Sequence, residues 1–417
     1  MTRAAACWLA VAVALALGAC GSSGGGSTGT PPTISGSDPG ARTRTANLSP
    51  AQARLTAQIA NHGVDWPYFG RVPERTHYIR TAPQPPFHFL WEFFAKQLLE
   101  FPPAVEGGRI FAVNKTGEVF SVRSSDGTQI WKTNLDNDVT GPAYGDGRIF
   151  IGQFNGDFTA LDAARGKRAW SFSPQGHIES TPLVVGRTVY FGDDRGNLYA
   201  VHATDGKPRW RVNLGAELKA SPSFHHGVIY VGDYAGGVHA VRASDGKPIW
   251  SVDTNNLPPG GSGGFYASPT IGFGRVYEAR NDGVVFALTL AGKPSWHLAT
   301  SAPVYGSVAI GPIAGRGPTA FVGSYDHRLY ALDATTGKQF WTFDVGGEIP
   351  GTPTVAGGTV YTSSFQTQKT YGLDAKTGKP TFHWGSAGYE PVISDGSQIF
   401  LTGFETIWSF ESKSAGG

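Results

Sequence analysis

Residues 331–341 read ALDATTGKQFW, and this stretch decides the fold because close variants of it recur along the chain. Residues 200–210 (AVHATDGKPRW) and 240–250 (AVRASDGKPIW) keep the leading Ala, the Gly-Lys pair and the closing Trp. The closing aromatic residue returns at intervals of 39 to 46 residues. Its positions are Trp91, Trp131, Trp170, Trp210, Trp250, Trp296, Trp341 and Phe382.

A proline early in each unit gives a second, independent marker of the same period. Pro103, Pro142, Pro182 and Pro222 each precede the next Trp of the series by 28 residues. Short apolar runs separated by Gly-containing turns lie between the two markers, and four such runs fit into one unit. A period near 40 with four short strands per unit is typical of a β-propeller blade.

The two ends of the repeat region complete each other. The last unit has three expected strands, near Pro391, at 399–400 and at 407–410, and then the sequence stops. Residues 87–93 (FHFLWEF) form a lone outer strand with no unit before it. Pairing the two leaves no open sheet edge. The sequence therefore predicts an all-β fold, an eight-bladed β-propeller of four-stranded blades over 87–417, closed by the N-terminal strand.

The repeated aromatic residue has a structural interpretation. A large ring on the outer strand fills the gap between neighbouring wedge-shaped sheets, and burying it stabilises the fold by a few kcal/mol. We therefore expect all eight aromatic positions, from Trp91 to Phe382, to be docking residues and not cofactor ligands.

The segments before the ring have their own signals. Arg3, an apolar run over 4–17 and the tetrapeptide LGAC at 17–20 predict an export signal over 1–19. The tetrapeptide resembles a bacterial lipobox, which implies cleavage before Cys20 and a lipid on its sulfur; an ordinary secretory signal is the alternative. Residues 20–48 are rich in Gly, Ser and Pro and indicate a flexible tether. Residues 49–86 are expected to form a short helix and an opening segment.

Composition excludes several classes of function. The chain carries 34 Lys and Arg against 32 Asp and Glu, which is too balanced to indicate a nucleic-acid partner. Its two cysteines, Cys7 and Cys20, exclude a disulfide framework, a multi-cysteine zinc site and a covalently attached c-type haem.

Positions that vary among the repeats indicate the candidate binding face. The turn before each closing Trp is regular and carries Gly-Lys in six units, whereas the loops at the opposite end of the strands differ from unit to unit. Exposed aromatic residues with Arg suit a contact surface for a protein or a glycan. The loop 255–265 is the longest there and is a candidate flap. The candidate residues are Glu179, Lys219, Tyr266, Tyr305, Phe154, Arg195, Tyr234, Arg280, Tyr325 and Phe365.

The stretch at 331–341 resembles the tryptophan-docking repeat, A-x-D-x-x-T-G-x-x-x-W, of pyrroloquinoline-quinone-type propellers. The opening sequence DWPYFG at 65–70 also looks like the first segment of that superfamily. WD-repeat propellers are the competing interpretation of the period, but no Trp here is followed by Asp. The resemblance implies one of two functions. Some members are quinoprotein dehydrogenases that bind pyrroloquinoline quinone and Ca²⁺ in the central funnel, and others are non-catalytic, such as the outer-membrane assembly lipoprotein BamB.

The sequence favours the non-catalytic function. It has no adjacent cysteine pair, calcium loop, nucleophile elbow or phosphate-binding loop, so we expect no catalytic residue, no metal and no cofactor. The expected protein is exported and lipid-anchored, on the outer surface of a membrane or the periplasmic face of an outer membrane. It acts as a BamB-like scaffold for envelope or membrane proteins, without nucleic acid. A dehydrogenase using pyrroloquinoline quinone and Ca²⁺, and a carbohydrate-binding or sensing propeller, are the alternatives.

Overall fold

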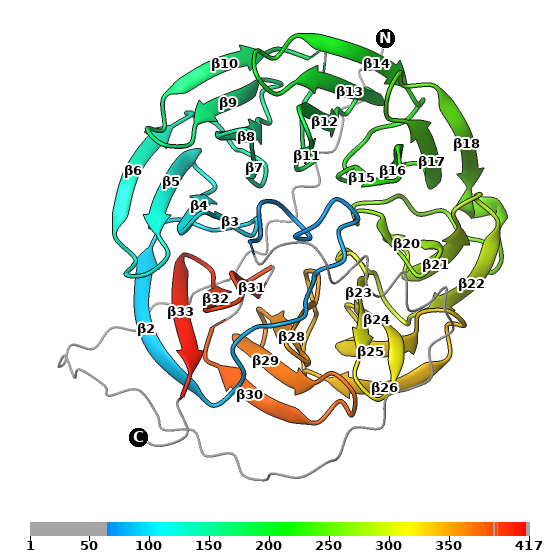
Figure 1. The fold of residues 1–417 in the computed structure, drawn as a ribbon. Coiled ribbons are helices and arrows are strands. Elements are labelled where there is room, and N and C mark those ends of the chain that lie inside the picture. Colours follow the sequence, from blue (N-terminus) through cyan, green and yellow to red (C-terminus); the bar gives the residue numbers. More distant parts are fainter. Residues whose placement is uncertain (1–64, 175, 387, 390, 414–417) are drawn as a thin grey trace, which may run out of the picture. The chain divides into compact units, whose positions relative to one another are not determined.

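The computed structural model describes residues 65–413 except 175, 387 and 390. Within this part the chain forms eight four-stranded antiparallel sheets arranged as a ring (Figure 1). The predicted all-β, eight-bladed propeller is therefore confirmed. The signal over 1–19, Cys20, the tether over 20–48 and the helix expected within 49–62 lie outside the described residues.

The blades are numbered in chain order, and each is given from its inner strand outward. The first four are β3 (Ala104–Glu106), β4 (Arg109–Val113), β5 (Glu118–Arg123), β6 (Gln129–Asn134); β7 (Ala143–Gly145), β8 (Arg148–Gly152), β9 (Phe158–Asp162), β10 (Arg168–Phe172); β11 (Leu183–Val185), β12 (Thr188–Gly192), β13 (Asn197–His202), β14 (Pro208–Asn213); and β15 (Ser223–His225), β16 (Val228–Gly232), β17 (Gly237–Arg242), β18 (Pro248–Asp253). The last four are β19 (Thr270–Gly272), β20 (Arg275–Ala279), β21 (Val284–Thr289), β22 (Pro294–Ala299); β23 (Ala309–Ile313), β24 (Gly317–Gly323), β25 (Arg328–Asp333), β26 (Gln339–Asp344); β27 (Thr354–Ala356), β28 (Thr359–Ser364), β29 (Lys369–Asp374), β30 (Pro380–Trp384); and β31 (Val392–Ser394), β32 (Ile399–Thr402), β33 (Thr406–Ser412), β2 (Phe87–Phe94).

The ring closes as the two incomplete ends of the sequence predict. Strand β2 pairs antiparallel with β33, with Phe87 opposite Ser412 and Phe94 opposite Thr406. The N-terminal strand thus supplies the outer edge of blade 8. Blade 7 gains an additional inner strand, β1 (Tyr78–Ile79), which pairs parallel with β27.

Burial follows the position of each strand in its blade. Middle strands are covered on both sides by neighbouring blades, so β12 (TVYFG) is buried throughout. Outer strands such as β14 (PRWRVN) have one side turned to solvent and alternate between exposed and half-buried residues. This period of two is the pattern of a half-buried strand.

The seven tryptophans dock onto the next blade in one common geometry. Each indole N–H donates to a backbone carbonyl of that blade, and each ring packs on a turn glycine there. Gly166 has φ +70°, and a Cβ at this position would lie 2.6 Å from the Trp131 ring. The acceptors, for Trp91 to Trp341 in order, are the carbonyls of Ser124, Ala163, Ala203, Ala243, Leu290, Ala334 and Ala375, at 2.9 to 3.3 Å.

The eighth position, Phe382, faces the closure of the ring. Blade 8 joins β33 to β2, which are the two ends of the ring, so it has no hairpin turn to offer a glycine and a carbonyl. The Phe382 ring instead meets Phe87 edge to face, with ring centroids 5.0 Å apart. Trp384 and Phe410 continue this aromatic cluster, 4.9 Å apart.

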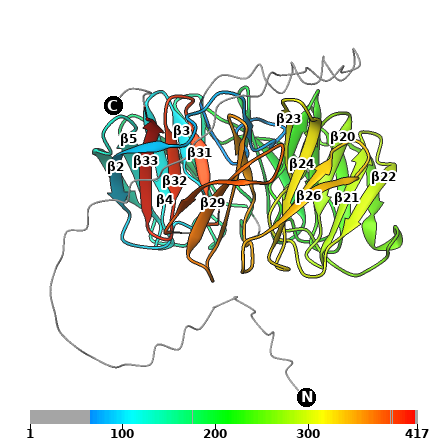
Figure 2. The ribbon, with the colours of Figure 1, turned by 90° about the horizontal axis from the view of Figure 1, so that it is seen from below.

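The connections define two faces of the ring (Figure 2). On one face the turns between inner strands lie beside the turns before the outer strands, as in the hydrogen bond from Ser124 N–H to the Gly108 carbonyl, 3.0 Å. We call this the turn face. On the other, the loops after the second strand meet the loops between blades, as in Phe154 N–H to the Asp138 carbonyl, 2.9 Å. We call this the mouth face.

The opening segment, residues 65–80, crosses the centre of the ring (blue in Figure 1). Its backbone is hydrogen-bonded to the inner strands of six blades, for example from Tyr144 N–H to the Pro67 carbonyl at 2.7 Å and from Ile310 N–H to the Thr76 carbonyl at 2.9 Å. Arg75 is fully buried and donates to the carbonyls of Pro222 in blade 4 and Thr181 in blade 3, just before the inner strands of these blades. The segment therefore ties the blades together across the channel.

A ladder of hydroxyl groups joins neighbouring blades near the mouth face. The residue before the inner-strand proline, or its equivalent, donates its N–H to the hydroxyl of the same position in the next blade. These bonds run from Thr181 to Ser221, Ser268, Ser307 and Thr352, at 2.8 to 3.0 Å.

In the described part of the chain, no helix is long and apolar enough to cross a membrane.

Candidate binding face

Four tyrosines form a continuous arc on the mouth face. They come from the variable loops of blades 4 to 6, and each ring contacts the next edge to face. Centroid distances are 4.9 Å for Tyr234 and Tyr266, 5.9 Å for Tyr266 and Tyr305, and 4.9 Å for Tyr305 and Tyr325. Burial raises the pKa of Tyr266 and of Tyr325 to about 12, so their hydroxyls stay protonated near neutral pH. The arc thus presents half-buried rings together with neutral hydroxyl groups.

Lys219 lies at one end of this arc, between aromatic rings and carboxylates. Its ammonium lies 4.6 Å from the Tyr234 ring centroid and 5.3 Å from that of Tyr266. It is also 3.4 Å from a carboxylate oxygen of Glu179 and from one of Glu217. Burial opposes the charged form, but the neighbouring acidic groups outweigh it and raise the pKa of Lys219 above its ordinary value. The cation is therefore fixed in a preorganised site.

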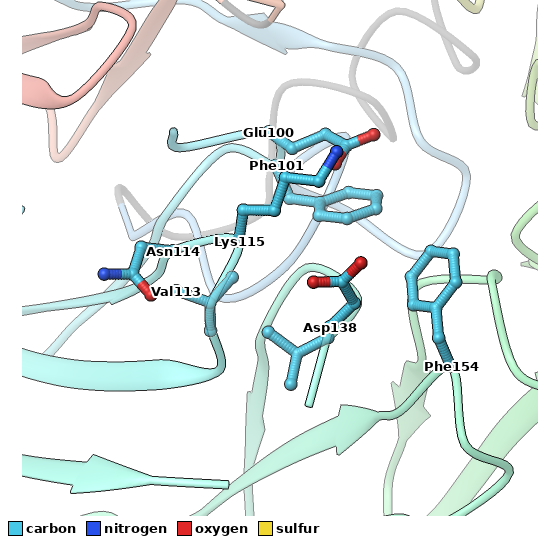
Figure 3. A pocket seen from close by; sticks show the side chains of 8 residues that line it. Glu100, Phe101, Val113, Asn114, Lys115, Asp138 and Phe154 are labelled. Carbon is cyan, nitrogen blue, oxygen red and sulfur yellow. The ribbon is translucent and has the colours of Figure 1, made fainter. Parts of the chain in front are cut away.

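An acidic hollow lies on the same face, between blades 1 and 2 (Figure 3). Burial raises the pKa of Glu100, the carboxylates of Asp138 and Glu179 raise it further, and Lys115 opposes the shift. Phe154 lines this hollow with Phe101, Val113, Asn114 and Val139. The mouth therefore combines an acidic side over blades 1 to 3 with an aromatic side over blades 4 to 6.

A second aromatic group completes the mouth on blades 7 and 8. The Phe365 ring lies 4.8 Å from the Tyr389 ring and 6.2 Å from the Phe404 ring, which is 55% exposed. Burial raises the pKa of Tyr389, and the carboxylate of Glu100 adds to that shift. Aromatic residues therefore extend along the mouth from blade 4 to blade 8.

The structure places the two candidate arginines differently. Arg195 is exposed on a blade 3 loop. Arg280 is fully buried, and its guanidinium donates to Asp282, to Asn255 Oδ1 at 2.9 Å and to the Gly260 carbonyl at 2.6 Å. Arg280 thus lies beneath the mouth face and holds the candidate flap, 255–265, on blade 5.

The structure places the predicted loops on one face and adds residues that the repeat spacing did not single out. Glu217 lies two positions before Lys219, and Tyr389 lies two positions before the repeat proline Pro391. Phe404 follows Gly403 in a short turn of blade 8 and could have been found by aligning that turn with the turn holding Phe365.

The placement of acidic side chains bears on a calcium-quinone site. Ca²⁺ takes six to eight oxygen ligands in proteins. Among residues 65–413, apart from the three left undescribed, no group of three or more His, Cys, Asp and Glu side chains is placed to hold a metal ion. The carboxylates of Glu179 and Glu217 flank Lys219 instead.

A curated relative, the outer membrane protein assembly factor BamB of Burkholderia pseudomallei (strain K96243), is 29% identical over 85 residues, which is 20% of this chain and 22% of that protein. The match thus spans about a fifth of the relative's length.

Two solved structures share the fold. BamB from Moraxella catarrhalis has a TM-score of 0.65 at 16% identity, covering 79% of this chain and 99% of that chain. The quinohemoprotein alcohol dehydrogenase of Comamonas testosteroni has a TM-score of 0.67 at 14% identity, covering 88% of this chain and 85% of that one. At such identities the likeness concerns the fold alone.

The family comparison extends over the whole ring. The model of one family, described as outer membrane protein assembly factor BamB, matches residues 88–217, 195–310 and 304–412. These overlapping matches cover all eight blades. The chain therefore belongs to the PQQ-like propeller family of the outer membrane assembly factor BamB.

Proposed function

We propose that the protein is an exported, lipid-anchored scaffold that binds an envelope or membrane protein on its mouth face, without catalysis or a cofactor. The tyrosine arc with its fixed Lys219 is the observation that carries this proposal. Family membership supports a scaffold role of the BamB type.

The chemistry of the mouth suits a protein partner. Tyrosine offers a large contact area at low cost in side-chain entropy, and contact hot spots between proteins are enriched in it. The acidic side, with Glu100, Asp138 and Glu179, favours a partner segment that carries Lys or Arg. Because the arc is half-buried and preorganised by its own ring contacts, little ordering is required when a partner binds.

The anchor belongs to the same proposal. A lipid on Cys20 would hold the ring at the outer surface of a membrane, or at the periplasmic face of an outer membrane. We expect Cys20→Ser to move the protein from the membrane fraction to the soluble fraction when cells are fractionated. Retention of the variant at the membrane would contradict lipid anchoring.

Partner capture tests the binding face. The full chain, tagged at its C-terminus, is crosslinked in intact cells, and the captured membrane proteins are compared between variants. We expect the triple variant Tyr234→Ala, Tyr325→Ala and Phe365→Ala to lose at least nine-tenths of the specific crosslinks, because truncated hot-spot residues cost more than about 1 kcal/mol each.

A matched control removes exposed apolar side chains elsewhere. Ile130 and Ile249 lie on outer strands and are 37% and 49% exposed. Their replacement by Ala should leave capture unchanged. Equal capture by the triple variant and the wild-type protein, with both folded by circular dichroism, would refute the mouth as the binding face.

A further inference from the structure

The turn face carries a ring of lysines. In six blades the turn before the outer strand places a Lys directly after a glycine of positive φ, and all six lysines are exposed. They are Lys167, Lys207, Lys247, Lys293, Lys338 and Lys379. Among the described residues, Lys167, Lys293 and Lys338 have no carboxylate within ion-pair distance, unlike Lys207, which lies 3.2 Å from Asp205.

The fold does not require these ammonium groups. The turn uses the backbone carbonyl of the lysine, as in Asp333 N–H to the Lys338 carbonyl, 2.8 Å. In blade 1 the same position is Thr128, and its carbonyl accepts from Arg123 N–H at the same 2.8 Å. A side chain without charge therefore completes the same turn, so the turn geometry does not explain why this position is a lysine in six blades.

Charge is divided sharply between the two faces. Among described residues, the turns of the turn face hold ten Lys and Arg against five Asp and Glu. The connections of the mouth face hold five Lys and Arg against thirteen Asp and Glu. The near-neutral net charge of the whole chain therefore conceals a molecule that is basic on one side and acidic on the other.

The arrangement of the cations selects the kind of partner. Equivalent turns of a ring of blades lie at one level, so their lysines are spread around one rim (Figure 2). A small anion would contact one or two of them, whereas an extended anionic surface can attract all six at once. Asp65, the first described residue, also lies toward the turn face. The residue after it, Trp66, pairs with Val105, which is close to the turn at 107–108.

We propose that the turn face lies against an anionic lipid surface, which leaves the mouth face directed away from the membrane. The attraction comes from phospholipid headgroups and does not depend on the anchor. It would convert a protein attached through the N-terminal part of the chain into one held in a single orientation. The inference is independent of the scaffold function, because it concerns the opposite face.

Vesicle binding tests this inference without the anchor. The segment 36–417, which begins after Cys20 and contains all eight blades, is sedimented with phosphatidylcholine vesicles that contain or lack phosphatidylglycerol. We expect binding to the anionic vesicles alone, weakening as salt rises. The triple variant Lys167→Thr, Lys293→Thr and Lys338→Thr copies the turn of blade 1. It should lose more than about tenfold in affinity, because each lysine near an anionic surface contributes roughly fivefold.

A control variant removes as much charge from the other side of the ring. Lys96, Lys132 and Lys369 lie on or beside the mouth face, and their replacement by Gln should change vesicle affinity less than about twofold. Two results would overturn the inference: no binding of the wild-type segment to anionic vesicles at low salt, or an equal loss in both triple variants. Neither result depends on whether the mouth captures a protein.

Discussion

At the scale of single residues, the docking aromatics show what a repeat can and cannot predict. The spacing of the tryptophans predicts their packing role, because an outer-strand ring must fill the gap to the next blade. The indole hydrogen bond, as from Trp210 to the Ala243 carbonyl at 2.9 Å, needs the neighbouring turn in place and is invisible in one repeat. The Phe at 382 also acquires its reason from the closed ring, since blade 8 has no turn to receive an indole.

A pair of substitutions tests this account of the docking position. Trp210→Phe removes one of two donors to the Ala243 carbonyl, the other being the Tyr190 hydroxyl at 3.2 Å, and it leaves a smaller ring in the gap between the blades. We therefore expect a loss of about 1 to 2 kcal/mol in the free energy of unfolding. Phe382→Trp should bring no gain, because no turn carbonyl faces it. Urea unfolding followed by fluorescence measures both. An unaffected Trp210→Phe, or a stabilised Phe382→Trp, would contradict the docking mechanism.

At the scale of elements, the regular strands are predictable and the opening segment is not. Strands such as β12 and β16 repeat a local pattern, so the sequence places them within a residue or two. Residues 65–80 have no such pattern, because their hydrogen bonds go to the inner strands of different blades. Arg75 illustrates the difficulty: an arginine is ordinarily exposed, yet here backbone carbonyls converging on the channel satisfy it.

The loops are partly predictable from the sequence: less so than the regular strands, and more so than the opening segment. Strand order fixes the face on which a loop emerges, so the tyrosines of blades 4 to 6 could be assigned to one mouth from sequence. The direction of a side chain depends on the loop's own backbone, which the repeat does not encode. Arg280 therefore turns inward and holds the loop 255–265, while Tyr266 turns outward and is 37% exposed.

At the scale of the whole molecule, the ring has two differently built openings. The opening segment crosses the channel near the turn face, and the mouth face carries the aromatic arc and the acidic hollow. A quinohemoprotein alcohol dehydrogenase has a ring of the same fold, so the fold by itself is compatible with either redox chemistry or scaffolding. The choice between the two functions depends on the side chains that the ring carries. Among the described residues, no group of three or more His, Cys, Asp and Glu side chains is placed to hold a metal ion.

A thermal-unfolding measurement tests directly whether the ring binds pyrroloquinoline quinone and Ca²⁺. A ligand present at about 100 times its Kd stabilises the folded state by roughly 2.7 kcal/mol, which raises the unfolding temperature by a readily measured amount. We expect residues 36–417 to unfold at the same temperature with and without pyrroloquinoline quinone and Ca²⁺. Ca²⁺ alone serves as the control for non-specific ion effects. A rise that requires both the quinone and Ca²⁺, and that disappears in Glu100→Gln, would place a cofactor at the mouth and replace the scaffold function with a redox one.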